Sequence, residues 1–262
     1  MPEGHTIHRI ARDHRRDLVG PPLRASSPQG RFAGECRRLG RRSLVAVEAH
    51  GKHLGYRWEG DVWLHVHLGL YGKFRRVAAP FPDPRGQVRL RVLGPERGFD
   101  LVGPNACELF TSDQWRSLAE RLGPDPLRSD ADPQRVWERL RRSRAPLGAL
   151  LLNQAVLAGV GNIYRSEALF LTGISPLRRG QDLLRSEFDL LWRTLCELLQ
   201  IGVRYNRIIV ADPAVVGKPR SRMARQERLL VYKKAACVRC SGPIEESIIG
   251  ARKAFACPAC QR

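Results

Sequence analysis

The spacing of apolar residues divides the chain into a mixed first part and a helical second part. Residues 4–19 carry apolar or ring side chains at helical spacing, which predicts a helix that ends before Pro21-Pro22. Short runs split by Gly, Pro and Asp follow up to residue 110, a pattern typical of a β-sandwich or barrel. Examples of the predicted strands are Ser43–Ala49, His53–Trp58, Val62–Leu68, Lys73–Val77, Val88–Leu93 and Glu108–Phe110.

Helical spacing dominates beyond residue 110. Thr111-Ser112-Asp113 is typical of a helix N-cap. Residues 203–225 mix Arg, Gly and Pro without periodicity, so we expect a mobile loop there. The predicted helices cover residues 114–121, 133–143, 147–154, 162–171 and 181–201. The expected divisions are a β-rich domain (1–112), a linker with one helix (113–132), a helical domain (133–228) and a cysteine-bearing module (229–262).

Four of the seven cysteines form two Cys-x-x-Cys pairs within the last module. Each pair holds two corners of a tetrahedral site, and four thiolates leave no position open for a catalytic water. The spacing therefore predicts one structural zinc ion in a reducing compartment and not a disulfide framework. The expected ligands are Cys237, Cys240, Cys257 and Cys260, and we expect no redox or nucleotide cofactor.

The chain carries a net charge of +19, from 45 Lys and Arg against 26 Asp and Glu. Because the excess is spread along the chain, it favours a folded surface that binds a polyanion, with nucleic acid as the first candidate and a membrane surface as the second. No stretch has the length of a transmembrane helix, and the polar N-terminus predicts no secretory signal. We expect a cytoplasmic monomer, nucleoid-associated when it is bound to DNA, with no membrane partner.

The first residues offer a nucleophile. If Met1 is removed, Pro2 presents a secondary amine whose ordinary pKa near 8 leaves part of it neutral at physiological pH. Glu3 places an acid/base group directly beside it, and an amine with such a neighbour is the minimum needed for Schiff-base catalysis. A protein that begins Met-Pro by chance explains these residues alone equally well.

Residues 146–176 contain two predicted helices joined by a turn with Gly159 and Gly161. Glycines let a backbone approach a ligand, and the second helix starts at Asn162, where free N–H groups are available to an anion. An ordinary helical hairpin with Asn162 as its N-cap explains the same residues, so both interpretations stay open.

Taken together, these features make the chain resemble the formamidopyrimidine-DNA glycosylase and endonuclease VIII family of base-excision-repair enzymes over nearly its whole length. The resemblance implies an α+β fold with an N-terminal helix, a two-layered β-sandwich, a helix–two-turns–helix domain and a zinc-finger β-hairpin. It rests on Pro2-Glu3-Gly4, Gly51–Leu54, His67–Gly72, Gly159–Tyr164 with Glu167, Leu230–Tyr232, and Cys257–Gln261, in the family's order.

The resemblance implies a bifunctional DNA glycosylase and lyase that acts on abasic sites in damaged DNA. The damaged nucleotide is flipped out of the duplex. Pro2 would then attack its C1′ atom, Glu3 would move protons, and β- and δ-elimination would cut the strand on both sides. Lys52 would assist at the phosphate and sugar.

By the same resemblance, Asn162 and Arg252 would grip the phosphates that flank the flipped nucleotide, and His67 would add a third phosphate contact. Leu70 and Tyr71 would wedge into the gap left by the extruded base. A strand histidine with a structural role and a core position for Leu70 are the competing explanations.

Two departures from the family's pattern bear on the substrate. The common Pro-Glu-x-Pro-Glu start is replaced by Pro2–Thr6, so a second carboxylate is missing and His5 is one candidate to substitute for it. The segment 102–107 lacks the arginine and aromatic wedge of the purine-lesion enzymes. We therefore expect oxidised pyrimidines as substrates, in double strands and also in bubbles or single strands. The alternatives are a non-catalytic protein that binds damaged or single-stranded DNA on this fold, and an RNA-binding zinc-ribbon protein.

Overall fold

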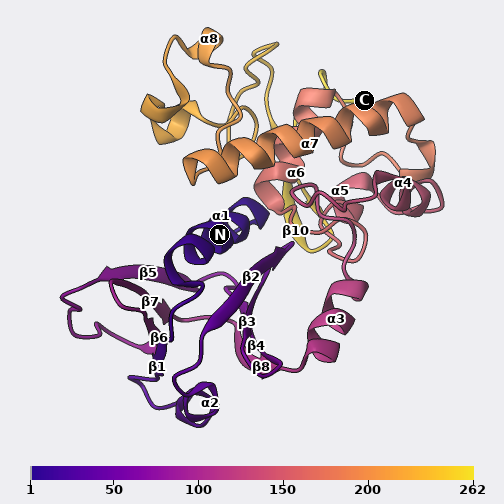
Figure 1. Ribbon diagram of the computed structural model, residues 1–262. Coiled ribbons are helices and arrows are strands. Elements are labelled where there is room, and N and C mark those ends of the chain that lie inside the picture. Colours follow the sequence, from indigo (N-terminus) through magenta and orange to yellow (C-terminus); the bar gives the residue numbers. More distant parts are fainter. Residues whose placement is uncertain (1) are drawn as a thin grey trace. The chain divides into compact units, whose positions relative to one another are not determined.

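The computed structural model describes residues 2–262, and the chain forms two compact units (Figure 1). The N-terminal unit comprises Pro2 and residues 7–121, and the C-terminal unit comprises residues 3–6 and 122–262. Met1, whose removal the expected chemistry requires, lies outside the described residues.

The N-terminal unit contains two four-stranded antiparallel sheets, with strand orders β1-β6-β7-β5 and β2-β3-β4-β8. The elements are α1 (Gly4–Leu18), β1 (Arg24–Ser26), α2 (Ala33–Leu39), β2 (Leu44–His50), β3 (His53–Trp58), β4 (Val62–His67), β5 (Lys73–Ala78), β6 (Val88–Leu93), β7 (Arg97–Val102), β8 (Ala106–Phe110) and α3 (Ser112–Arg121).

Helix α1 contributes its apolar stripe to the core between these sheets. His14 is buried there, stacks on Phe99 at 4.6 Å between ring centroids, and shares a 2.7 Å hydrogen bond with Tyr56. Strand β7 was absent from the sequence expectation because its polar Asp100 hid the pattern. That carboxylate is buried and accepts two hydrogen bonds from Arg91, at 2.6 and 2.9 Å, so a polar pair fills a core position.

The C-terminal unit is helical up to the cysteine-bearing hairpin. Its helices are α4 (Pro133–Arg141), α5 (Leu147–Leu150), α6 (Asn162–Thr172), α7 (Arg185–Tyr205) and α8 (Pro213–Val216), with 3₁₀ turns at Gly180–Asp182, Arg220–Arg222 and Arg225–Glu227. The hairpin consists of β9 (Glu245–Ile249) and β10 (Arg252–Ala256). The fold class expected from the sequence is confirmed, and within residues 2–262 no helix is long and apolar enough to cross a membrane.

Several expected segments differ in detail. The helix expected at 181–201 runs from Arg185 to Tyr205, and the stretch expected to hold only short strands contains α2. The helix expected at 147–154 ends at Leu150, because the side chains of Asn153 and Gln154 bond to nearby backbone groups and compete with helical bonding. The expected loop at 203–225 begins with the end of α7 and then packs around a small apolar cluster of Ile209, Ala211 and Met223.

A buried carboxylate attaches the last module to α6. Glu167 is fully buried and accepts N–H bonds from Leu230, Val231 and Tyr232 at 2.8–3.1 Å. Burial raises the pKa of Glu167, although those N–H groups oppose the shift. Glu167 and the Leu230–Tyr232 motif, which are far apart in the sequence, therefore contact each other directly.

Candidate functional site

Glu3 occupies the start of helix α6 in the C-terminal unit. Its side chain is fully buried, and its two carboxylate oxygens accept hydrogen bonds from the N–H groups of Gly161 and Ile163, both at 2.9 Å. The N–H of Tyr164 lies 3.5 Å from the same carboxylate. A negative charge at this place satisfies donors that a helix leaves unpaired and is stabilised by the helix dipole. The anion at the start of α6 is thus the chain's own carboxylate, so the N–H groups of Gly161 and Ile163 are not free for another anion, as one of the two open interpretations expected.

Two glycines, Gly161 and Gly4, make room for this contact. A Cβ on Gly161 would lie 2.3 Å from the carboxyl carbon of Glu3, and a Cβ on Gly4 would lie 2.9 Å from the Cα of Gly159. The N–H of Gly4 donates to the carbonyl of Gly159 at 2.8 Å. The first turn of α1 therefore lies backbone against backbone on the glycine turn, an approach that a side chain at residue 4 would prevent.

His5 does not replace the negative charge of the missing second carboxylate, because an imidazole is either neutral or positive. The ring is buried, and its edge packs on Tyr164 at 5.3 Å between centroids. Burial lowers the pKa of His5 to about 4, so the ring is neutral at pH 7.

The N-terminal unit carries Pro2 at intermediate exposure, just before α1, and Lys52 in the turn between β2 and β3. Gly51 adopts φ 59°, the left-handed conformation that this tight turn requires. The positive charge of Lys52 contributes to the lowered pKa of His67, after the larger effects of burial and of His65. The sequence-predicted Lys52 and His67 therefore lie in one electrostatic neighbourhood.

A histidine network that sequence reasoning missed extends from this neighbourhood. His53 Nδ1 lies 2.9 Å from His65 Nε2, and His65 Nδ1 lies 3.0 Å from a carboxylate oxygen of Glu108. The ring centroids of His53 and His67 are 4.8 Å apart. Burial, with neighbouring histidines and Lys52, lowers the pKa of His53 to about 3, so it is neutral. The His-x-His spacing on β4, which places His65 and His67 on one face, was the available signal.

Leu70 and Tyr71 stand at the tip of the turn between β4 and β5. They are 53% and 83% exposed, so the interpretation of Leu70 as a core residue was wrong. The connection between β7 and β8 lies beside this turn, because a Cβ on Gly69 would meet the side chain of Asn105 at 2.7 Å. That connection spans only residues 103–105, too short to carry a separate wedge.

Asn162 and the backbone next to Arg252 are in contact in the C-terminal unit. The Asn162 side-chain amide donates to the carbonyl of Lys253 at 3.0 Å. Arg252 is exposed at the start of β10, whereas Lys253 pairs with Glu246 at 2.6 Å. Both basic residues near the hairpin tip are exposed, and Lys253 is the one that forms this ion pair.

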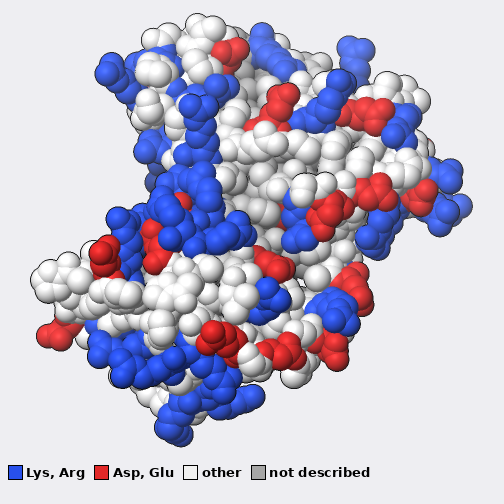
Figure 2. Space-filling view, viewed as in Figure 1, with Lys and Arg blue, Asp and Glu red and all other residues white. Residues whose placement is uncertain are grey.

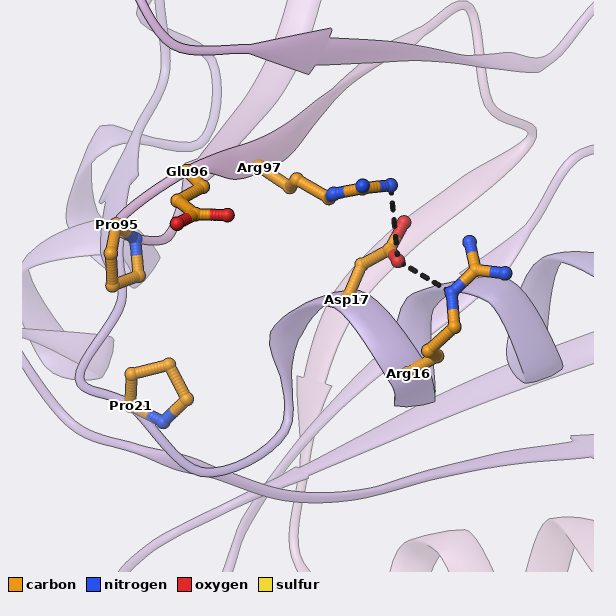
Figure 3. Close-up of a pocket in the computed structure, with 6 residues that line it drawn as sticks. All are labelled: Arg16, Asp17, Pro21, Pro95, Glu96 and Arg97. Carbon is orange, nitrogen blue, oxygen red and sulfur yellow. Dashed lines mark hydrogen bonds and ion pairs between the residues drawn. The ribbon is translucent and has the colours of Figure 1, made fainter.

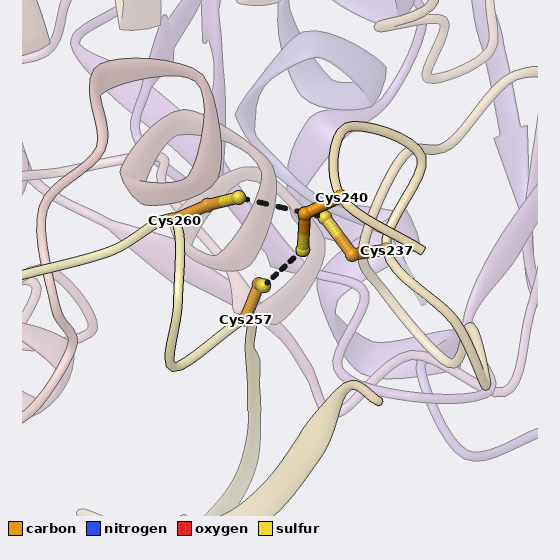
Figure 4. A group of neighbouring side chains, drawn as sticks. All are labelled: Cys237, Cys240, Cys257 and Cys260. Carbon is orange, nitrogen blue, oxygen red and sulfur yellow. Dashed lines mark hydrogen bonds between the residues drawn. The ribbon is translucent and has the colours of Figure 1, made fainter. Parts of the chain in front are cut away.

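The four cysteines come together at the base of the hairpin (Figure 4). Their sulfur atoms all lie within 4.8 Å of one another, with Cys237 and Cys260 3.8 Å apart and Cys240 and Cys257 3.5 Å apart. Zn–S bonds of about 2.3 Å in a tetrahedron give sulfur separations of about 3.8 Å. The cluster therefore fits a structural zinc site, and Gln261 ties it to the helices by bonding the N–H of Cys257 and a helix-connecting carbonyl.

Lys and Arg side chains gather over α1 and around α2 on the face shown in Figure 2. An open pocket of about 420 Å³ lies at the end of α1 (Figure 3). Within it Asp17 pairs with Arg16 at 2.8 Å and lies 3.7 Å from Arg97. The pocket contains no sequence-predicted site residue, and two of its arginines, Arg16 and Arg97, are neutralised by Asp17. Its lining residues are Arg16, Asp17, Pro21, Pro95, Glu96 and Arg97.

Comparisons with known proteins agree with these features. Family models described as the formamidopyrimidine-DNA glycosylase N-terminal domain and H2TH domain match residues 1–104 and 122–213. Endonuclease 8 1 of Mycobacterium tuberculosis is 46% identical and covers 100% of both chains. The formamidopyrimidine-DNA glycosylase of Thermomicrobium roseum is 32% identical over 100% of this chain and 99% of its own. A solved complex of Lactococcus lactis Fpg with abasic-site DNA has a TM-score of 0.81, 25% identity and 99% coverage of each chain.

Proposed function

We propose that this protein, which belongs to the formamidopyrimidine-DNA glycosylase and endonuclease VIII family, excises oxidised pyrimidines from DNA through an N-terminal proline Schiff base. Family membership makes it a base-excision-repair enzyme, a DNA glycosylase with lyase activity at abasic sites. The observation that carries the proposal is the position of Glu3, a buried carboxylate directly after the proline that backbone N–H groups hold in place.

In the proposed reaction, the neutral Pro2 nitrogen attacks C1′ of the flipped nucleotide and the base leaves. The sugar ring opens to an iminium, which withdraws electrons, so that β-elimination breaks the C3′–O bond and δ-elimination then breaks the C5′–O bond, and each releases a phosphate end. Glu3 moves protons at the sugar and at the imine. Its fixed seat matters because a catalytic carboxylate must be held near the reacting atoms before the substrate binds.

The cationic and amide donors bind the DNA backbone in this proposal. Lys52 acts at the phosphate and sugar, with His67 as a further phosphate contact. Asn162 and Arg252 bind phosphates that flank the flipped nucleotide. The affinity for DNA should therefore fall as the salt concentration rises, because each cationic contact releases counterions from the DNA.

The lesion preference rests on the exposed wedge. Leu70 and Tyr71 project from a turn beside a three-residue connection that carries no arginine or aromatic residue. Inserted into the duplex, they would stack on the neighbouring bases in place of the extruded base. We assign the enzyme to oxidised pyrimidines in double strands, bubbles and single strands, as a cytoplasmic monomer that associates with the nucleoid.

One zinc ion bound by Cys237, Cys240, Cys257 and Cys260 completes the proposal. The four thiolates would bind it without an open position, so the ion supplies a cross-link and no catalytic water. The cross-link keeps the hairpin that carries Arg252 folded, since the module has a small apolar core of its own.

The proposal is tested by single-turnover cleavage of end-labelled duplexes that contain thymine glycol, 5-hydroxycytosine or 8-oxoguanine. We expect the two pyrimidine lesions to be cut faster, and the product to carry phosphates at both ends, as β,δ-elimination requires. Faster cleavage of 8-oxoguanine would contradict the pyrimidine preference. Binding to all duplexes without cleavage would favour the alternative function, a non-catalytic damage-binding protein.

A further inference from the structure

Arg165 is a buried cation whose hydrogen bonds go to neutral oxygens. It lies in the first turns of α6 and is 0% exposed. One guanidinium nitrogen donates to the carbonyls of Gly148 at 3.0 Å and Ile249 at 3.4 Å. The second terminal nitrogen donates to Asn162 Oδ1 at 2.5 Å and to the carbonyl of Lys253 at 2.7 Å. A buried charge with no carboxylate among these acceptors is costly, so its retention calls for a role.

The guanidinium stays charged in this environment. Burial lowers the pKa of Arg165 to about 10, while the nearby charge of Glu3 opposes that shift and Arg252 adds to it. At pH 7 the side chain is therefore a full cation beside the start of α6.

Arg165 determines which way the Asn162 amide faces. The Asn162 oxygen accepts from Arg165, and its nitrogen donates one hydrogen to the carbonyl of Lys253. A flipped amide would place its oxygen against that carbonyl and its NH₂ group against the guanidinium, which are two repulsive contacts. The guanidinium thus selects the orientation in which Asn162 keeps its second N–H for another acceptor.

The same guanidinium fixes the hairpin turn. It binds the carbonyls of Ile249 and Lys253, which bracket Gly250, Ala251 and Arg252. The backbone that carries Arg252 is therefore anchored to α6 by the side chain that orients Asn162.

We propose that Arg165 is a positioning residue for DNA binding, which holds the Asn162 amide and the Arg252 backbone in the one arrangement that binds a phosphate. This inference rests on the proposed phosphate contacts of Asn162 and Arg252. Arg165 itself acts through these two residues.

A double-mutant cycle tests this inference. The dissociation constant for a duplex with a tetrahydrofuran abasic site is measured for Asn162→Ala, Arg165→Met and the double variant. We expect each single variant to weaken binding about tenfold and the double variant to be no weaker than either alone. Arg165→Lys should bind with intermediate affinity, because an ammonium keeps the charge but lacks the planar fork.

Glu167→Gln provides the matched control. It disturbs another buried clamp of α6 without contacting Asn162, so its effect on binding should multiply with that of Asn162→Ala. Multiplying effects for Arg165→Met and Asn162→Ala, or unchanged binding in Arg165→Met, would overturn the inference while leaving the proposed phosphate contacts intact. Unchanged binding in Asn162→Ala would refute the phosphate contact itself, and the inference with it.

Asn162→Asp keeps the test decisive even if Arg165→Met does not fold. The new carboxylate would pair with the intact Arg165 guanidinium, but its second oxygen would face the carbonyl of Lys253 and could not donate to a phosphate. We therefore expect DNA binding weaker than that of Asn162→Ala, and binding as tight as in the unmodified protein would contradict the assigned contact.

Discussion

Gly161→Ala tests whether the position of the Glu3 carboxylate controls catalysis. Gly161 has φ −122°, a conformation that any residue adopts, so alanine would add a Cβ without backbone strain. That Cβ would lie 2.3 Å from the carboxyl carbon of Glu3 and 2.7 Å from one of its oxygens. Ordinary contact begins near 3.4 Å, so the carboxylate or the glycine turn must move by about 1 Å.

Such a shift has two calculable effects. Misplacing a catalytic group by about 1 Å costs roughly 10²-fold in rate, so we expect a loss of that order in single-turnover strand cleavage at a preformed abasic site. Removing one hydrogen bond between a backbone N–H and the charged carboxylate costs about 1.5–3 kcal/mol of folding free energy. The melting temperature should therefore fall by roughly 5 °C.

Gly34→Ala is the matched control, because its Cβ would meet only a guanidinium nitrogen of Arg37, at 3.9 Å. This substitution lies within helix α2 and should raise stability by about 0.5–1 kcal/mol with no effect on cleavage. A Gly161→Ala protein that cleaves within twofold of the unmodified rate would refute the reasoning.

The remaining predictions concern pH, the wedge and zinc. Burial lowers the pKa of His14 to about 4 from its ordinary 6.5, so the folded state binds fewer protons than the unfolded state between these two pH values. About 3 kcal/mol of stability should therefore be present above pH 6.5 and be lost as the pH falls toward 4. Melting scans in which His14→Gln shows the same dependence of stability on pH would contradict this. Tyr71→Ala should leave the melting temperature unchanged, since the ring is 83% exposed, yet slow base excision in duplexes by roughly 10-fold and much less in single strands; equal slowing in both would argue against a wedge. Chelation of zinc, or Cys257→Ser, should unfold the hairpin and weaken DNA binding. Zinc release and the fluorescence anisotropy of labelled DNA measure the two effects, and undiminished DNA binding after full release of zinc would exclude the structural role.

The sequence indicated the parts of the site that depend on local pattern. The two Cys-x-x-Cys pairs, the start of α6 at Asn162 and the exposed turn with Tyr71 follow from spacing and turn chemistry, which act over a few residues. Strand β7 was not predicted because the buried Asp100 interrupts its apolar run. The burial of this carboxylate is compensated by its two hydrogen bonds from Arg91, which the sequence alone does not reveal.

The contacts that organise the site join distant residues and left no periodic signal. Glu3 meets Gly161 across most of the chain, and nothing local distinguishes Arg165 from a surface arginine. The glycine motif was recognised in the sequence, but only the structure shows that it binds the Glu3 carboxylate. His65 likewise acquires its partner Glu108 only through strand pairing.

Borohydride trapping tests the central claim most directly. The protein is mixed with abasic-site DNA, reduced, digested and analysed by peptide mass. We predict a stable adduct on the peptide that begins with Pro2, and no adduct when an uncleaved N-terminal extension converts that nitrogen into an amide. An adduct on a lysine peptide such as that of Lys52, or one that persists in the extended protein, would contradict the claim that Pro2 is the nucleophile.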